Sequence, residues 1–133
     1  DISNKKYPEF LELYRKIIFE TCQLLKDDRF ACFVVGEVRD KKTGCYYGFV
    51  PDTIQAFKDA GLKLYNEAIL LTAIGSLPIR AGKAFSAGRK LGKTHQNVLV
   101  FLKGDFKKAT AACGEVEVSD LCFDAAVGAG EQL

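Results

Sequence analysis

The chain has 133 residues, a length that fits one domain with a buried core. Its residues are 48% apolar and 27% charged, and no run approaches the roughly 18 apolar residues that a membrane span needs. The net charge is only +2, the start does not resemble a signal peptide, and Met is absent throughout. We expect a globular protein without a membrane segment, processed or trimmed from something larger.

The first half predicts a helix, a strand and a second helix. Apolar residues recur at three- and four-residue steps from Pro8 to Leu25, which indicates a helix. The continuous apolar run Phe30–Val35 favours a strand buried on both faces, followed by a turn. A second helix is predicted from Phe49 to Ala60, and Gly61 is well placed to end it in the left-handed conformation.

The second half predicts two strands joined by a long loop. The strands are Leu64–Ile74 and Asn97–Lys103, and the loop begins at Gly75. After Asp105 the pattern weakens. We therefore assign residues 1–104 to an α/β domain and residues 105–133 to a peripheral segment or tail.

The order of these elements predicts an α/β sheet with helices on both faces. Strands that alternate with helices indicate parallel strands, and the last two strands, which lack a helix between them, form an antiparallel pair. Ligands of such sheets bind beyond the C-terminal ends of the parallel strands. This rule predicts a substrate edge that consists of Gly36, Glu37, Arg39 and Asp40.

Positive charge is concentrated between Gly75 and Gly104, a stretch without any acidic residue. Its six Lys and Arg residues, against a chain total of +2, leave −4 for the rest. Four glycines lie in this stretch before Asn97, Gly75 included. A flexible basic loop suits a phosphate backbone, because each Lys or Arg that neutralises a phosphate releases counterions. The alternative is a solvated surface loop. The predicted nucleic-acid-binding residues are Arg80, Lys83, Phe85, Arg89, Lys90 and Lys93.

Three segments carry a resemblance to a known family. LLKDDRFACFVVGEVRD, FVPDTIQAFKDAGLKLYNEAILL and RKLGKTHQNVLVFLKG stand in this order between Leu24 and Gly104. Together they resemble the C-terminal half of a class I S-adenosylmethionine-dependent DNA amino-methyltransferase, of the adenine-N6 or cytosine-N4 type found in phages and prophages. The resemblance covers roughly Tyr7 to Gly104. It implies a partial Rossmann-like methyltransferase sheet, DNA as partner, and S-adenosylmethionine as cofactor of the complete enzyme.

The family's catalytic and cofactor motifs are not visible in this chain. Its signature of Asp, Asn or Ser before Pro-Pro-Tyr or Pro-Pro-Phe is absent, as is its glycine-rich cofactor loop. Gly128-Ala129-Gly130 neither follows a strong strand nor opens a helix. We therefore assign no catalytic residue, and we expect the isolated chain neither to bind S-adenosylmethionine nor to transfer methyl groups.

Histidine and cysteine usage predicts no metal site. The five cysteines contain no CxxC pair and are accompanied by one histidine, His95, for which strand-entry hydrogen bonding is favoured over catalysis. An odd number of cysteines without a disulfide framework fits a reducing cytoplasm. The cysteines are Cys22, Cys32, Cys45, Cys113 and Cys122.

Aromatic residues beside the turn and in the loop have two interpretations each. Tyr46, Tyr47 and Phe49 could stack a base, although packing of the turn is favoured, and Phe85 could stack a base or anchor the loop. At the level of the whole chain, the rivals to a methyltransferase half are a non-catalytic nucleic-acid-binding module and an oligomerising interaction domain. An open sheet edge would favour a homo-oligomer or a companion N-terminal half.

Overall fold

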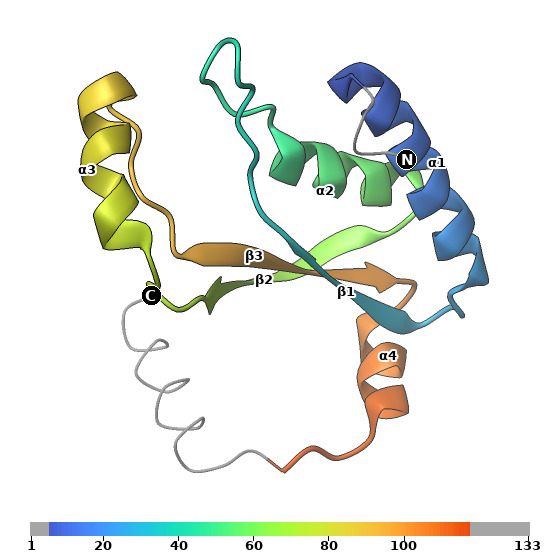
Figure 1. The fold of residues 1–133 in the computed structure, drawn as a ribbon. Coiled ribbons are helices and arrows are strands. Elements are labelled where there is room, and N and C mark those ends of the chain that lie inside the picture. The colour runs from blue at the N-terminus through green and yellow to red at the C-terminus, as the bar shows by residue number, and fades with distance from the viewer. Residues whose placement is uncertain (1–5, 118–133) are drawn as a thin grey trace.

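The computed structural model describes residues 6–117 and alternates helices with strands (Figure 1). None of the described helices is both long and apolar enough to cross a membrane. The elements in chain order are α1 (Tyr7–Leu24), β1 (Arg29–Val35), α2 (Phe49–Asp59), β2 (Lys63–Leu71), α3 (Leu77–Gly88), β3 (His95–Lys103) and α4 (Phe106–Cys113).

The three strands form one sheet in the order β1-β3-β2, and both pairings are antiparallel. Phe33 lies opposite Leu99 on one side of β3, and Ala68 lies opposite Val98 on the other. The predicted antiparallel pair β2–β3 is confirmed. A parallel pairing is not found among the described residues, because β3 runs back between β1 and β2 and pairs with both.

The direction of β1 and β2 brings the ends of both strands to one edge of the sheet. Both strands run antiparallel to β3, so their C-terminal ends lie at the same edge of the sheet. The turn that follows β1 and the segment that follows β2 therefore leave the sheet on the same side (Figure 1).

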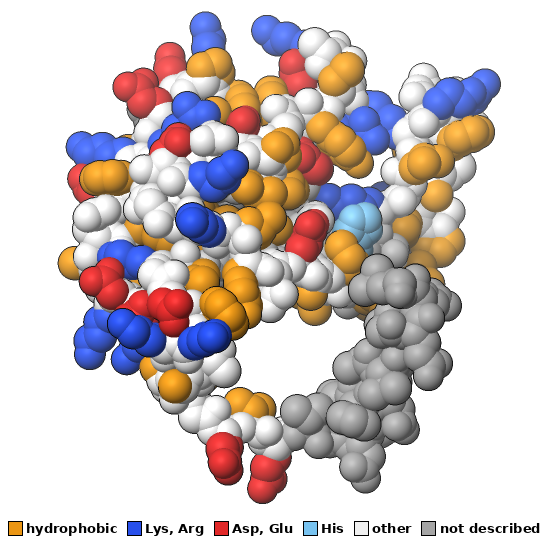
Figure 2. Space-filling view, turned by 180° about the vertical axis from the view of Figure 1, so that it is seen from behind, with side chains coloured by type: hydrophobic (Ala, Val, Ile, Leu, Met, Phe, Trp, Pro, Cys, Tyr) orange, Lys and Arg blue, Asp and Glu red, His pale blue; other side chains and the backbone are white. Residues whose placement is uncertain are grey.

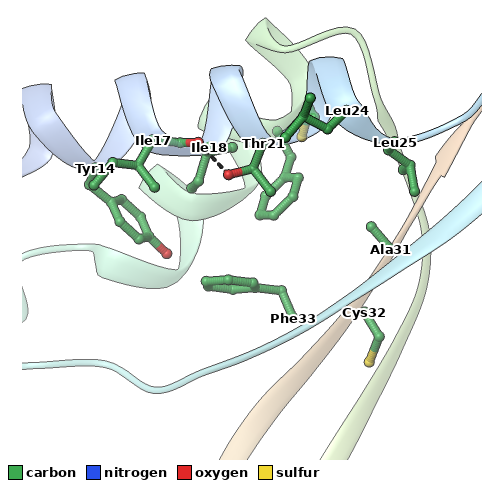
Figure 3. A pocket seen from close by; sticks show the side chains of 11 residues that line it. Tyr14, Ile17, Ile18, Thr21, Leu24, Leu25, Ala31, Cys32 and Phe33 are labelled. Carbon is green, nitrogen blue, oxygen red and sulfur yellow. Dashed lines mark hydrogen bonds between the residues drawn. The ribbon is translucent and has the colours of Figure 1, made fainter.

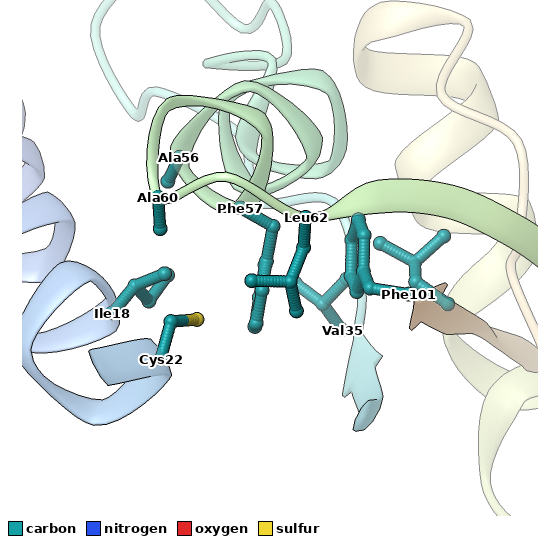
Figure 4. Close-up of a cluster of buried hydrophobic side chains, with 9 residues drawn as sticks. Ile18, Cys22, Val35, Ala56, Phe57, Ala60, Leu62 and Phe101 are labelled. Carbon is teal, nitrogen blue, oxygen red and sulfur yellow. The ribbon is translucent and has the colours of Figure 1, made fainter. Parts of the chain in front are cut away.

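The core lies between the sheet and the two helices α1 and α2, which cover one face, while α4 lies on the other (Figure 1). Figure 4 shows Ile18 and Cys22 from α1 facing Ala56 and Ala60 from α2. At its centre the rings of Phe57 and Phe101 stack with centroids 4.1 Å apart and an angle of 12° between their planes. The buried apolar residues of this cluster are Ile18, Cys22, Val35, Ala56, Phe57, Ala60, Leu62, Leu99 and Phe101.

A lysine side chain caps the C-terminal end of α1, and a glycine ends α2. Lys103 Nζ donates to the carbonyl oxygens of Cys22 and Leu25 at 2.8 and 2.6 Å, which satisfies acceptors that α1 leaves free at its C-terminus. Gly61 follows α2 with φ +92°, which confirms its predicted left-handed role.

The predicted basic loop is wrong in its first half, which is the helix α3. Pro78 lies in its first turn, where the missing N–H costs nothing, and Arg89 follows the helix in the left-handed region with φ +53°. None of the residues of α3 is buried. Its half-buried residues are Leu77, Ala81 and Ala84, which recur at helical spacing, but two of them are alanines and the apolar period is weak.

The segment predicted to be peripheral contains one described element. α4 spans Phe106–Cys113, and the side chain of Asp105 caps it by accepting from Lys108 N at 3.0 Å. Residues 118–133, which include Cys122 and Gly128-Ala129-Gly130, lie outside the described residues.

Candidate nucleic-acid interface

The predicted substrate edge is a hairpin-like turn between β1 and α2. Arg39 forms an isolated antiparallel bridge with Tyr46, and Asp40 N donates to the Cys45 carbonyl at 2.9 Å. Gly44 closes the turn by donating from its N–H to the Asp40 carbonyl, at φ +74°. A residue with a side chain would be strained at that φ.

The Asp40 carboxylate holds the turn together from the side. It accepts from Lys42 N at 2.9 Å and from Thr43 Oγ1 at 3.2 Å. The backbone hydrogen bond from Lys42 is the main reason that the pKa of Asp40 lies below its usual value. The Asp40 carboxylate therefore binds within its own turn, and the charged side chains that the turn presents to solvent are cations.

The Glu37 carboxylate binds the N-terminus of α2. Its two oxygens accept from Phe49 N at 3.0 Å and from Val50 N at 3.1 Å. These N–H groups have no partner within the helix, and the helix dipole favours an anion at this end. Glu37 thus fixes α2 against the strand that precedes it.

The aromatic residues of the turn pack on α1 and on a cation. Tyr47 stacks on Tyr7 with centroids 4.3 Å apart, and Phe49 lies 5.1 Å from Tyr14. The Arg39 guanidinium lies over the Tyr46 ring at 4.2 Å and donates to the Gly44 carbonyl at 2.9 Å. These contacts fit the favoured packing interpretation.

The basic residues at the end of α3 face this turn. Arg89 donates to the carbonyls of Phe85 and Ser86 at 3.0 and 3.4 Å, and its guanidinium lies 5.2 Å from the Phe85 ring. The Lys90 side chain passes Gly44, where a Cβ would lie 3.7 Å from Lys90 Cε. Two loops far apart in sequence therefore meet at one place.

Two neighbouring hollows lie between these loops. The first, of about 460 Å³, is called the basic hollow; the second, of about 380 Å³, is called the mixed hollow. Arg39 lines the first and stacks on Tyr46, which lines the second. The basic hollow is lined by Arg39, Lys41, Lys42, Thr43, Gly44, Cys45, Gly88, Arg89 and Lys90, and the mixed hollow by Glu37, Tyr46, Val50, Pro51, Lys93, His95 and Asn97.

Figure 2, which views the molecule from behind, shows Lys and Arg side chains on both sides of a hollow that lies above the single histidine. His95 opens β3 and is partly buried at this position. Lys93 reaches back toward the turn, with Nζ 3.4 Å from the place of a Cβ on Gly36. The hollows thus combine residues from the predicted substrate edge with residues from the predicted basic set.

The structure separates the other predicted residues from these hollows. Arg80 and Lys83 lie exposed on α3, and Phe85 is half-exposed beneath Arg89. Sequence reasoning missed Lys41 and Lys42, which line the basic hollow. The sequence could have predicted them, because Arg39, Lys41 and Lys42 place three cations within four residues of a turn.

Comparisons with known proteins support the fold. No family model matches the chain, and no curated protein matches it. One solved structure with a matching fold is TTHA0409 of Thermus thermophilus, a protein assigned as a DNA modification methylase. The two share 16% sequence identity at a TM-score of 0.57. The match covers 86% of this chain but 41% of the other, so the chain spans about two-fifths of that protein's length.

The described residues of the interface do not fit a cofactor or metal site. A nucleoside cofactor needs a carboxylate for its ribose, but the Glu37 carboxylate that lines the mixed hollow already accepts from the first N–H groups of α2. Within residues 6–117, no group of three or more His, Cys, Asp or Glu side chains converges to hold a metal. The interface offers cations, amides and aromatic faces instead.

Proposed function

We propose that this chain is the C-terminal part of an S-adenosylmethionine-dependent DNA amino-methyltransferase, and that its interface of two hollows contacts the DNA. The observation that carries the proposal is the meeting of the β1–α2 turn with the segment after α3, where Arg39, Lys41 and Lys42 face Arg89 and Lys90. The fold shared with a protein assigned as a DNA modification methylase supports it.

The proposal assigns different roles to the two hollows. The cations of the basic hollow neutralise backbone phosphates, which is the main source of affinity in protein–DNA contacts. In the mixed hollow Tyr46, Asn97 and His95 present a ring and polar groups beside Lys93. We place the edge of the bound strand there, with Arg80, Lys83 and Phe85 on α3 contacting flanking DNA.

The test is binding of duplex DNA at several salt concentrations. Replacing Arg89, Lys90 and Lys93 with Ala should weaken binding and reduce the slope of log affinity against log salt by about 0.9 for each phosphate that is no longer neutralised. Lys58, Lys63 and Lys107 are a matched control, because they are exposed, carry the same charge and lie toward the opposite edge of the sheet. An unchanged slope in the first variant, or equal losses in both, would contradict the proposal.

We further propose that the rest of the methyltransferase pairs with the free edge of β1. Within the described residues β1 pairs only with β3, and beside it lies an apolar groove of about 410 Å³ between α1 and β1 (Figure 3). Ile17, Leu24 and Cys32 are exposed along this groove. Unpaired strand edges beside apolar surface attract another strand.

The occupant that fits is a strand from the methyltransferase half that this chain does not match, since 59% of the similar structure has no counterpart here. That half would also supply the catalytic signature and the cofactor loop. Sedimentation of the chain alone and mixed with such a half tests this proposal. A stable one-to-one complex supports the proposal. A homodimer that does not bind the added half contradicts it, and so does a chain that remains monomeric after the half is added.

The proposed division of labour also predicts that the chain alone does not bind S-adenosylmethionine. Calorimetry with the isolated chain should give no heat of binding at micromolar cofactor. Micromolar binding would place the cofactor site in this chain. DNA binding without methyl transfer, even after the companion half is added, would favour the non-catalytic nucleic-acid-binding module.

A further inference from the structure

We infer that the basic hollow is a binding site for a single phosphate group, held between the β1–α2 turn and the C-terminal end of α3. The assignment of this phosphate to a DNA backbone rests on the proposed function. The inference that the hollow binds a phosphate group does not. Five cations line the hollow, and Lys41 and Lys42 belong to neither set of residues predicted from the sequence.

Charge at the hollow is strongly unbalanced. Arg39, Lys41 and Lys42 approach from the turn, and Arg89 and Lys90 approach from the other side, while none of the acidic residues within 6–117 lines the space. The acid of the turn, Asp40, directs its carboxylate to Lys42 N and Thr43 Oγ1. Five like charges around one space repel one another, so an anion between them stabilises the folded arrangement.

Two of the five cations are held in place by other contacts. Arg39 donates from one terminal nitrogen to the Gly44 carbonyl, and its guanidinium carbon lies over the Tyr46 ring. Arg89 donates from one terminal nitrogen to the end of α3. Each guanidinium has five N–H donors, so both keep free donors with a fixed direction. Fixed donors lose less entropy when they bind an anion.

The remaining features favour phosphate over a carboxylate. A phosphate group offers about three acceptor oxygens where a carboxylate offers two, so it can accept from donors on both walls of the hollow at once. The hollow of about 460 Å³ holds a hydrated group of this size, since one water occupies roughly 30 Å³ of liquid. Thr43 adds a hydroxyl to the lining, and Gly44 and Gly88 place backbone without side chains on its two walls.

The test is a titration of the chain with inorganic phosphate at constant ionic strength. Binding is followed through the NMR shifts of the backbone amides. We expect saturable shifts centred on Gly44 and Gly88. The variant K41A/K42A should weaken phosphate binding by about tenfold, the factor carried by one charge-assisted hydrogen bond. The variant K107A/K108A is the control, because it removes an equally exposed Lys-Lys pair from α4. No saturable shift at the two glycines, or equal weakening in both variants, would overturn the inference.

A second arm separates the sources of the phosphate. A short duplex without terminal phosphates presents only backbone phosphodiesters. If the backbone is the source, the duplex shifts the same two amides and inorganic phosphate competes with it. If phosphate shifts them and the duplex does not, the site takes a free phosphate or a nucleotide, and the proposed DNA contact fails while the site stands. Duplex binding elsewhere, with no phosphate effect at the glycines, would leave the proposed function intact and contradict the inference.

Discussion

The helices α2 and α3 differ sharply in how they relate to the sheet. α2 buries Thr53, Ala56 and Phe57, and a carboxylate from the β1–α2 turn caps its start. α3 buries no residue, and its end faces the basic hollow. Both helices follow a strand of the same sheet, yet one builds the core and the other does not.

The contrast separates stability from function within one small domain. Apolar burial contributes most of the folding free energy, so a helix without buried residues adds little to it. Such a helix is free to carry charge that would be costly inside a core. The difference between α2 and α3 therefore predicts which substitutions change stability and which change binding alone.

The largest expected effect is at the centre of the core. Replacing Phe101, which is 0% exposed and stacks on Phe57, with Ala should lower the free energy of unfolding by about 3–5 kcal/mol. Replacing Phe85 of α3, which is 48% exposed, with Ala should change it by less than about 0.5 kcal/mol. Urea denaturation measures both. Similar losses in the two variants would remove the contrast between the regions.

A smaller effect is expected where the packed region meets the interface. Replacing Glu37 with Ala removes both acceptors from the start of α2 and should cost about 1–2 kcal/mol. Glu37→Gln keeps one acceptor oxygen and should cost less. If Glu37→Ala leaves the denaturation midpoint unchanged but abolishes DNA binding, Glu37 acts on the substrate and not on the helix.

The smallest effect concerns Tyr7, at the edge of the packed region. Burial, followed by the hydrogen bond to Asp52 at 2.6 Å, raises the pKa of Tyr7 well above 10. A raised pKa means that this contribution to stability is complete below about pH 10, the value for an unfolded tyrosine, and is lost as the pH rises above it. Tyr7→Phe should cost about 1 kcal/mol at neutral pH.

An absorbance titration checks the ionisation of Tyr7. The difference between the original chain and Tyr7→Phe should show no phenolate near pH 10 while the protein remains folded. A normal titration of Tyr7 in the folded chain would contradict the hydrogen bond to Asp52.

The packed region was predictable from the sequence because its signal is local. The helix predicted from Pro8 to Leu25 is α1, Tyr7–Leu24, and the strand predicted at Phe30–Val35 is β1 with one residue added. The helix carries an apolar period, and the strand carries a continuous apolar run. The expectation that this strand is buried on both faces is wrong, because Cys32 and Val34 are exposed and only the opposite face packs on the core. β2 was predicted too long, since it ends at Leu71, and all its residues are exposed.

The interface was only partly predictable because it depends on distant contacts. No local sequence pattern predicts that β3 runs between β1 and β2. That arrangement brings Lys42 of one loop and Lys90 of another to the same hollow. The helix α3 was missed because none of its residues is fully buried and two of its three half-buried residues are alanines. The excess of positive charge between Gly75 and Gly104 predicts Arg89 and Lys90. Lys41 and Lys42 of the β1–α2 turn lie outside that segment and were not predicted.

The central claim is that DNA binds where the β1–α2 turn meets the segment after α3. Mapping the amide NMR shifts of the chain during titration with a short duplex tests it most directly. The account predicts shifts that concentrate in residues 36–46 and 88–97, fall as salt rises, and spare α4 and the start of β2. Shifts centred on α4, or a map that does not change from low to high salt, would contradict it.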